Sequence, residues 1–480
     1  MNSRLLPTLA GYWDGAFRPL ATLPTFDVVD PATTSTLASL PTYSTDHASL
    51  AVDAAAGALA QPPSLEQRGK WLLAVERALL DNLTELAQII TAENGKPIAE
   101  SQGEVRYSAG FFADAANQLT HLDSRDLPIT AKGHRWRLHH RPAGVAGLIT
   151  PWNFPMGMLA KKLSGAIAAG CPTVIKPSEL TPLSCIAWFT LLHDLDLPKG
   201  FVNLVFGDAP AIGQVLCERM EVRVISFTGS TGVGRLLATQ SAPNLKRMSL
   251  ELGGNAPYVV FDDADLDHAV GHLMANKFRN AGQTCVCANR ILVQDAAYDA
   301  FIRRASDRVR ALVVGPGADL NTDVGPLIDE RARIKVASMV TDAVAHGAVI
   351  AVGGNSAPGE GAFFEPTLLT GVTASMRCSQ EELFGPVVAI ERFVDEEAGI
   401  LRANDTEYGL AAYVFSTDVD RLERVAARLH FGHVGLNTGT GPTPEVPFGG
   451  MQQSGLGREG GLEGILEYIE LQTCPTPAIP

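Results

Sequence analysis

The sequence predicts an α/β protein with two lobes. Its 480 residues, 46% of them apolar, are enough for two or three domains that each bury a core. From Pro142 to about Val260, short apolar runs alternate with helical stretches, which is typical of parallel βαβ units. A second alternation of this kind runs from about Pro257 to Leu436. The chain is therefore expected to form two α/β lobes in series.

The segment before the first lobe has a different composition. Residues 1 to about 50 are rich in Pro, Thr and Ser and predict an irregular arm with a few strands. From residue 50 to about 122, apolar residues such as Trp71, Val75 and Leu79 recur at three and four positions, which indicates amphipathic helices. We expect these helices to cover one face of a sheet.

The apolar runs of the lobes predict strands, and the stretches between them predict helices. In the first lobe, the expected strands are Val145–Ile149, Thr173–Ile175, Val202–Phe206, Val224–Phe227 and Met248–Leu250, and the expected helices are Met156–Ala169, Pro182–His193, Ala209–Cys217 and Gly232–Gln240. In the second lobe they are the strands Arg290–Val293 and Val349–Val352 and the helix Tyr298–Leu312. Ligands of open parallel sheets bind beyond the carboxyl ends of the strands, so residues just after these strands are the candidates for function.

Composition excludes several classes of function. The chain has 38 Lys+Arg against 52 Asp+Glu, a formal charge of -14, which argues against a nucleic-acid partner. It contains no run of about 18 to 20 uncharged apolar residues and no basic start followed by a long apolar core. We therefore expect no membrane partner and a cytoplasmic protein. Its seven cysteines are few and odd in number, so no disulfide framework is expected.

Cys285 lies in the segment Gly282–Cys287, between an expected helix that ends near Asn280 and a strand that starts near Arg290. A cysteine on such a glycine-containing loop can act as a nucleophile, or it can be a small buried core residue. Cys287 follows two positions later. No CxxC pair or nearby histidine completes a zinc site, so no metal is expected.

Two further polar residues follow expected strands. Glu251 is followed by Gly253 and Gly254, which leave space around its carboxylate; it suits a general base, and a capping or solvated glutamate is the alternative. Asn153 lies between two prolines in Ile149–Pro155, where a rigid amide could donate to a developing oxyanion. A stiff turn is the alternative there.

Two segments suit a nucleotide. Ser226–Gly234 runs from a strand through small residues into a helix, so free N–H groups and the helix dipole form an anion site. Its glycine spacing differs from the standard dinucleotide fingerprint. Glu179 follows the strand Thr173–Ile175, where a carboxylate can accept hydrogen bonds from a ribose diol or can simply favour a helix N-terminus.

These motifs together resemble the aldehyde dehydrogenase superfamily, and most closely its succinate-semialdehyde dehydrogenases. The resemblance spans residues 150 to 460, and the segments Phe278–Arg290 and Ser454–Gly460 carry the closer likeness. In chain order the motifs are PWNFP, GCPTVIKPSE, FTGSTGVG, ELGGNAP, FRNAGQTCVCANR, EELFGP, NDTEYGLAAYVF and PFGGMQQSGLGREG.

The resemblance implies an aldehyde dehydrogenase-like α/β fold with three parts. A Rossmann-type, dinucleotide-binding domain would comprise residues 1–126 and 144–250, and a catalytic domain residues 251–436. A small β oligomerisation arm would comprise residues 127–143 and 470–480. The family likeness also implies a homodimer or a homotetramer.

It further implies NAD(P)-dependent oxidation of an aldehyde to its carboxylic acid. Cys285 would be the nucleophile that forms a thiohemiacetal and then a thioester. Asn153, beside the Cys285 backbone N–H, would bind the oxyanion, and Glu251 would activate the hydrolytic water. The alternative hypothesis is a CoA-acylating dehydrogenase, in which the thioester is transferred to CoA. Glu251 argues against this alternative, because transfer to CoA needs no activated water.

Family correspondence also places residues around the cofactor. These are Thr150, Pro151, Trp152, Lys176, Ser178, Glu179, Gly229, Ser230, Leu252, Glu382 and Phe384. A carboxylate at Glu179 would bond the ribose hydroxyls and repel a 2′-phosphate. NAD is therefore expected over NADP, with NADP possible.

The expected substrate is a small aldehyde that carries a carboxylate. Relatives that act on succinate semialdehyde hold this group with two arginines and a serine, which correspond here to Lys161, Arg279 and Pro442. Of these three residues, only Arg279 is retained. Lys161 keeps the positive charge but lacks the bidentate fork of an arginine, and Pro442 lacks the hydroxyl of a serine. Succinate semialdehyde is the first expectation, and another semialdehyde or an aliphatic aldehyde is the alternative. A solvated helix face is the competing reading of Lys161 and its neighbour Lys162.

Cys287 has two readings. The resemblance suggests a redox partner of the nucleophile, although a disulfide between residues two apart is strained. Passive packing is the other reading.

Overall fold

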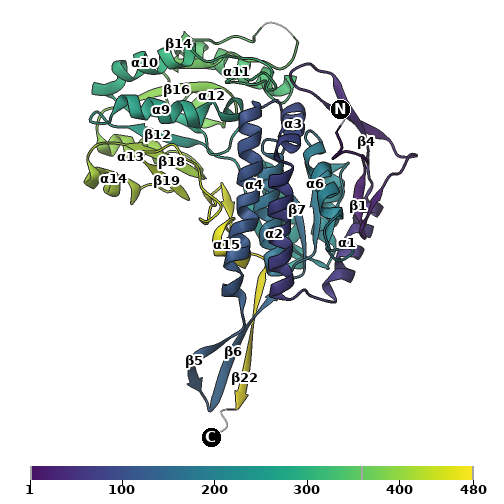
Figure 1. Ribbon diagram of the computed structural model, residues 1–480. Coiled ribbons are helices and arrows are strands. Elements are labelled where there is room, and N and C mark those ends of the chain that lie inside the picture. The colour runs from purple at the N-terminus through teal and green to yellow at the C-terminus, as the bar shows by residue number, and fades with distance from the viewer. Residues whose placement is uncertain (1–2, 358–359, 478–480) are drawn as a thin grey trace.

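The computed structural model describes residues 3–357 and 360–477. Two α/β lobes lie side by side, and a narrow β-sheet projects below them (Figure 1). The two-lobed α/β architecture agrees with the prediction from the alternating strands and helices. Strand β7 has the predicted bounds, Val145–Ile149, whereas β10 and β11 extend beyond the predicted runs, to Val222–Thr228 and Arg247–Glu251.

The described part of the first lobe contains an eight-stranded sheet in the order β2-β1-β9-β8-β7-β10-β11-β21. Its five central strands, β9 to β11 in this order, are parallel, and antiparallel strands close both edges. The strands not yet bounded are β1 (Gly11–Trp13), β2 (Ala16–Arg18), β8 (Thr173–Lys176), β9 (Val202–Leu204) and β21 (Gly455–Leu456). Strand β21 comes from the Gly-rich C-terminal segment, which therefore returns from the second lobe to the first.

The helices of the first lobe form more layers than predicted. Helix α1 (Thr45–Leu59) packs against β7, β8 and β9, whereas α2 (Leu65–Asp81) and α4 (Ile98–Gln118) pack on α5 (Pro155–Ala169). In Figure 1, α2 and α4 stand in front of the strands. The other elements are β3 (Thr25–Val29), β4 (Thr36–Pro41), α3 (Leu83–Asn94), η1 (Leu119–Leu122), α6 (Leu183–His193), α7 (Ala209–Glu218), α8 (Thr231–Ser241) and η2 (Ala242–Asn244).

In the second lobe, seven described strands form a sheet in the order β14-β15-β16-β13-β12-β18-β19. Only the β14–β15 pair is antiparallel in this described sheet. The strands are β12 (Ala256–Val260), β13 (Ala288–Gln294), β14 (Val349–Val352), β15 (Thr367–Thr370), β16 (Val387–Phe393), β18 (Ala411–Phe415) and β19 (His433–Leu436).

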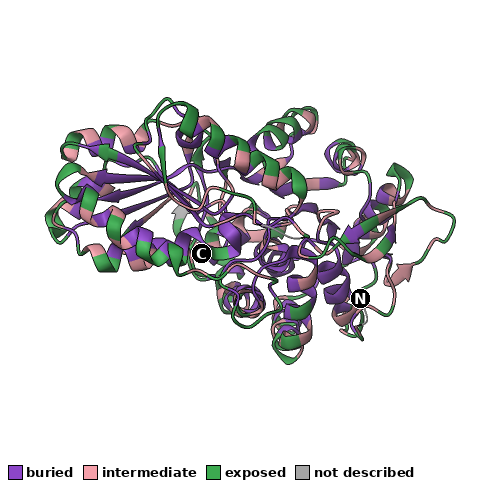
Figure 2. Cartoon of the chain, turned by 90° about the horizontal axis from the view of Figure 1, so that it is seen from above, coloured by how far each residue is buried: buried purple, intermediate pink, exposed green. Residues whose placement is uncertain are grey.

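Both faces of this second sheet are covered by helices. Successive side chains of a strand point to opposite faces, so Tyr258 and Val260 belong to one core while Val259 belongs to the other. Figure 2 shows the strands buried and the outer helix faces exposed. The helices and short elements are α9 (Leu266–Lys277), η3 (Arg279–Gly282), α10 (Asp295–Arg310), α11 (Glu330–Ala345), α12 (Arg377–Gln380), α13 (Glu396–Asn404), β17 (Tyr408–Gly409), α14 (Val419–Ala426), β20 (Met451–Gln452) and α15 (Gly461–Leu466).

The projecting sheet consists, in the described chain, of β5 (Arg125–Ala131), β6 (His134–Pro142) and β22 (Ile469–Pro477). Strands β6 and β22 are antiparallel, with Pro142 opposite Ile469 and His134 opposite Pro477. These strands coincide with the predicted β arm of residues 127–143 and 470–480, of which residues 478–480 lie outside the described residues. The role of this arm in assembly stays a prediction.

Candidate active site

Two cavities meet at Cys285 and Asn153, which line both of them. The first cavity has a volume of about 390 Å³ and the second about 310 Å³. Asn153 comes from the turn after β7 in the first lobe, and Cys285 from the loop between α9 and β13 in the second lobe. The site therefore exists only where the two lobes meet.

The two cavities separate the predicted substrate residues from the predicted cofactor residues. Arg279, Lys161 and Pro442 line the first cavity. The predicted cofactor residues on the second cavity are Pro151, Trp152, Gly229, Ser230, Leu252, Glu382 and Phe384. The predicted residues that line neither cavity are Thr150, Lys176, Ser178, Glu179, Glu251 and Cys287.

A strained loop presents Cys285. Asn280, Ala281 and Gly282 all have left-handed backbone, with φ of 50°, 53° and 75°, which non-glycine residues rarely adopt. Gly254 makes the close packing possible, because a Cβ at this position would lie 2.5 Å from the Cys285 carbonyl oxygen. The surrounding structure thus holds an unfavourable turn that aims Cys285 at the junction of the cavities.

Cys285 is set up as a protonated thiol beside a free donor. Burial raises the pKa of the Cys285 thiol to about 12, and the Glu382 carboxylate adds to the effect while the Lys161 ammonium opposes it. Within the described chain, the backbone N–H of Cys285 donates to no protein acceptor. This N–H is therefore available to an oxygen atom bound at the sulfur.

Asn153 is held from its backbone and from its side chain. Its Nδ2 donates to the Gln283 carbonyl at 3.0 Å, and its backbone carbonyl accepts from Lys96 Nζ at 2.7 Å and from Asn280 Nδ2 at 2.9 Å. An amide nitrogen has two donor hydrogens. One of them is committed to Gln283, and the other remains for a ligand.

Glu251 ends strand β11 and is buried. Burial raises its pKa well above the ordinary range, and the nearby Glu459 carboxylate raises it further, while Lys161 and Lys162 oppose the shift. Both carboxyl oxygens lack a hydrogen-bond partner within the described chain. Lys162 Nζ pairs with Glu459 and donates to Ser226 Oγ at 3.2 Å. Glu251 is thus an unpaired buried carboxyl group that can take up a proton.

The reading of Lys161 and Lys162 as a solvated helix face is wrong. Lys161 is 7% exposed and Lys162 is fully buried, because α5 is covered by α2, α4 and α15. Burial lowers the pKa of Lys161, but Tyr107, Glu459 and other acidic groups raise it above its ordinary value. A charged lysine therefore faces the first cavity.

The cations of the first cavity rest on aromatic rings. Lys161 Nζ lies 4.7 Å from the centre of the Phe448 ring, and the Arg279 guanidinium carbon lies 5.2 Å from that of Phe154. Neither cation has a salt-bridge partner among the described residues. The first cavity thus carries two cations without salt-bridge partners, which a ligand anion can approach, and its wall also contains the carboxyl groups of Glu100 and Glu104.

The second cavity fits the nicotinamide end of a dinucleotide. It lies at the carboxyl ends of β10 and β11, beside the N-terminus of α8, where a parallel sheet binds such ligands. Trp152 and Phe384 form an edge-to-face pair 5.5 Å apart in its wall, and the buried Thr228 hydroxyl has no protein partner in the described chain. Burial raises the pKa of the Glu382 carboxyl to about 7. Apolar walls and unpaired polar groups are what a planar ring with an attached ribose requires.

The remaining predicted cofactor residues lie at the same edge of the sheet but outside this cavity. Lys176 Nζ forms an ion pair with Glu179 at 2.6 Å, and the Lys176 carbonyl accepts from the Thr150 N–H at 3.1 Å. Ser178 Oγ accepts from the Leu180 N–H at 3.3 Å. Their predicted contacts with a cofactor stay predictions.

Cys287 is buried and is a free thiol, as is Cys285. Its Sγ donates to the Gly282 carbonyl at 3.4 Å and lies 3.8 Å from Lys277 Nζ, which donates to it. These contacts fit the packing role, and the redox role stays a prediction.

Several residues at the site were absent from the sequence interpretation. Glu100 and Glu104 line the first cavity, Lys96 pairs with Glu104 and donates to the Asn153 carbonyl, and Glu459 lies near Glu251. The sequence feature that could have indicated them is the pair Glu100 and Glu104, two acidic residues four positions apart in an amphipathic helix. Such a pair usually lies on a solvated face, so it did not single out these residues.

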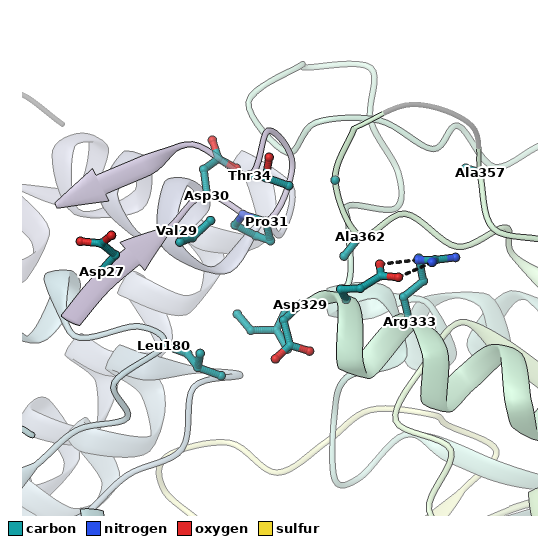
Figure 3. Close-up of a pocket in the computed structure, with 13 residues that line it drawn as sticks. Asp27, Val29, Asp30, Pro31, Thr34, Leu180, Asp329, Arg333, Ala357 and Ala362 are labelled. Atoms are coloured by element: carbon teal, nitrogen blue, oxygen red, sulfur yellow. Dashed lines mark hydrogen bonds and ion pairs between the residues drawn. The ribbon is translucent and has the colours of Figure 1, made fainter. Parts of the chain in front are cut away.

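A larger cavity of about 690 Å³ lies away from Cys285, between the β3–β4 hairpin and the start of α11 (Figure 3). Asp27 accepts from Ser39, Asp329 caps α11 by accepting from the Ala332 N–H, and Glu330 pairs with Arg333. Its acidic side chains are therefore engaged in local contacts.

In the described ranges 3–357 and 360–477, no group of three or more His, Cys, Asp or Glu side chains could hold a metal ion. Over the same ranges, no helix is both long enough and apolar enough to span a membrane.

Comparison with known proteins identifies the family. Residues 18–474 match the aldehyde dehydrogenase family. A probable succinate-semialdehyde dehydrogenase [NADP(+)] of Sinorhizobium fredii is 44% identical over 454 residues, covering 93% of this chain and 92% of that protein. A glutarate-semialdehyde dehydrogenase of Pseudomonas putida is 43% identical, covering 93% of each chain.

A solved structure also matches. The succinate-semialdehyde dehydrogenase of Burkholderia pseudomallei superposes with a TM-score of 0.97 at 43% identity, covering 99% of both chains. The aldehyde dehydrogenase-like fold that the motifs implied is therefore confirmed. By sequence and by fold, the chain belongs to the aldehyde dehydrogenase family.

Proposed function

We propose that this protein oxidises an aldehyde with a distal carboxylate to the corresponding dicarboxylic acid, and that succinate semialdehyde is its first candidate substrate. The observation that carries the proposal is the pair of unpaired cations, Lys161 and Arg279, in the cavity that ends at Cys285. A semialdehyde has its carboxylate at one end and its reactive carbon at the other. Binding the first group to the cations directs the second to the sulfur.

In the proposed mechanism, Cys285 attacks the aldehyde carbon. Its thiol must first lose a proton, and the raised pKa of Glu251 makes this carboxylate a competent acceptor. The oxyanion that forms is bound by Asn153 Nδ2 and by the Cys285 N–H. A nicotinamide cofactor bound beside Trp152 and Phe384 would supply the hydride acceptor that oxidises the Cys285 thiohemiacetal to the thioester. Glu251 must release the thiol proton to solvent before it can accept a proton from the water that hydrolyses the Cys285 thioester. The hydrolysis frees the carboxylic acid and returns the sulfur as a thiolate, which is protonated again.

For the cofactor, we propose that Thr228, Glu382 and the Trp152–Phe384 pair hold the nicotinamide end, and that Glu179 favours NAD over NADP. The Glu179 carboxylate would accept hydrogen bonds from the ribose hydroxyls and would repel a 2′-phosphate. The Sinorhizobium relative is named for NADP(+), so the preference must be measured with both cofactors. We expect a higher kcat/KM with NAD.

CoA acylation is the second candidate reaction. The carboxyl group of Glu251, free of protein partners in the described chain, favours water over CoA as the acceptor. NADH formation that required CoA would reverse this preference.

A panel of aldehydes tests the proposal. We expect kcat/KM for succinate or glutarate semialdehyde to exceed that for an uncharged aldehyde of equal length by about 10- to 100-fold, which is the worth of one charge-assisted contact. Each aldehyde should be measured with NAD and with NADP. Equal values for the charged and uncharged members would contradict the carboxylate assignment.

We also propose that the predicted arm of residues 127–143 and 470–480, whose described part lies in the sheet of β5, β6 and β22, mediates a homodimer or a homotetramer. The exposed apolar side chains Ile129 and Leu471 on this sheet support the idea. Light scattering of the full chain and of Leu471→Glu tests it, and a monomeric full chain would contradict it. The boundaries 1–126 with 144–250, and 251–436, remain the proposed division into domains.

A further inference from the structure

A buried ion pair contributes Glu104 to the wall of the first cavity. Lys96 Nζ and Glu104 Oε2 are 2.6 Å apart, and both side chains are 0% exposed. Burying two charges costs desolvation energy that their attraction does not always return, so such a pair is weak evidence for stability. The hydrogen bonds and contacts of the Lys96–Glu104 pair therefore indicate whether the pair has a role other than stabilising the fold.

Those contacts converge on the segment that carries Asn153. Lys96 donates to the Asn153 carbonyl at 2.7 Å, and its ammonium lies 3.8 Å from the centre of the Phe154 ring. Glu104 Oε1 accepts from the N–H groups of Met156 and Gly157 at 2.9 and 3.0 Å. These N–H groups start helix α5, whose N-cap residue Phe154 provides no side-chain acceptor. Glu104 thus caps α5 from another helix.

One turn earlier on α4, Glu100 holds the other half of the site. Its Oε2 accepts from the Asn280 N–H at 2.7 Å, at the start of the left-handed turn before Cys285. Residues four apart lie on the same face of a helix. Glu100 and Glu104 therefore hold two loops from different lobes. Asn280 Nδ2 joins these loops by donating to the Asn153 carbonyl at 2.9 Å.

We propose that Lys96, Glu100 and Glu104 are positioning residues for the reaction at Cys285. They hold the two loops in register, so that the Asn153 amide and the Cys285 N–H point at the same oxygen. The inference rests on the proposed function, because the two donors affect the rate only if an oxyanion forms between them. A shift of one ångström between such groups can cost about 100-fold in rate.

A double-mutant cycle tests the role of Lys96. In Lys96→Met, kcat for the best aldehyde should fall by about 10- to 100-fold, while KM for the cofactor stays within about twofold. Asn153→Ala should lower kcat by about 100- to 1000-fold. Because Lys96 acts through Asn153, adding Lys96→Met to Asn153→Ala should lower kcat by no more than about twofold. Effects that multiply, or an unchanged kcat in Lys96→Met, would overturn the inference.

The matched control is Lys70→Met, which removes a lysine from an exposed pair with Glu66 at 2.7 Å on α2. It should retain wild-type kinetics. If the wild type oxidises no aldehyde of the panel, the proposed function fails first. If the wild type is active and Lys96→Met is equally active, only the positioning role fails.

A second variant covers the case in which Lys96→Met does not fold. Glu100 is only half-buried, so Glu100→Ala leaves no buried charge without its ion-pair partner. We expect kcat about tenfold lower with an unchanged cofactor KM, because the Asn280 turn loses its acceptor. A melting temperature near that of the wild type together with an unchanged kcat would contradict the role of Glu100.

Discussion

The two cavities that meet at Cys285 differ in the charge they offer. The first presents Lys161 and Arg279 without salt-bridge partners among the described residues, together with the Glu100 and Glu104 carboxyls. The second presents one ammonium group, of Lys335, and one carboxyl group, of Glu382. The Lys161 and Arg279 charges attract a carboxylate to the first cavity, whereas the Lys335 and Glu382 charges of the second cavity oppose each other. Because Cys285 lines both cavities, one sulfur atom can face a ligand in each of them.

Removing the shared residue should have the largest effect. We expect Cys285→Ala to lower kcat by about 10⁴-fold or more, because no other side chain can form the thioester. Cofactor binding, measured by fluorescence titration, should persist, since the second cavity keeps its other walls. Substantial activity in Cys285→Ala would mean that the cavities do not meet at the reacting atom.

Removing a positive charge from the first cavity tests whether this cavity binds the carboxylate of the substrate. Arg279→Ala should raise KM for succinate semialdehyde by about 100-fold, through loss of a charge-assisted contact. The kinetics with an uncharged aldehyde should change by no more than about threefold. An equal loss on both substrates would show that Arg279 supports the loop rather than the carboxylate.

The carboxyl of the second cavity should appear in the pH dependence of stability. Because the folded-state pKa of Glu382 is about 7, above its unfolded value, its contribution is complete below about pH 4.5 and is lost as pH rises toward 7. Glu382→Gln should therefore reduce the fall in unfolding free energy between pH 5 and pH 7.5 by about 2 to 3 kcal/mol. Urea titrations at both pH values measure this, and parallel curves for the two proteins would contradict it.

The smallest effect is expected at Glu179, which we expect to bind the ribose hydroxyls of the cofactor. Glu179→Gln removes the charge that we expect to repel a 2′-phosphate and should narrow the NAD-to-NADP ratio of kcat/KM by about fivefold to tenfold. An unchanged ratio would assign the preference to residues other than Glu179.

The features that could be predicted from the sequence are those that depend on residues close together in the chain. Apolar periodicity predicted the central strands of the first lobe, but only two of the seven described strands of the second-lobe sheet. The roles of Cys285, Asn153 and Glu251, which each follow a predicted element beside glycine or proline, stay predictions. Features that depend on contacts between residues far apart in the chain could not be predicted. Burial of Lys161 depends on helices that pack over α5, and the capping of α5 by Glu104 joins residues 52 positions apart.

The sequence by itself thus determined the fold class, the family and the candidate residues on the two loops that meet at Cys285 and Asn153, because periodicity and short motifs are local properties of the chain. Only the tertiary structure decided which charges remain unpaired around Cys285 and how the loops are held together. Burial, pKa and hydrogen-bond geometry depend on neighbours that the chain brings together from both lobes, and no local pattern records those neighbours.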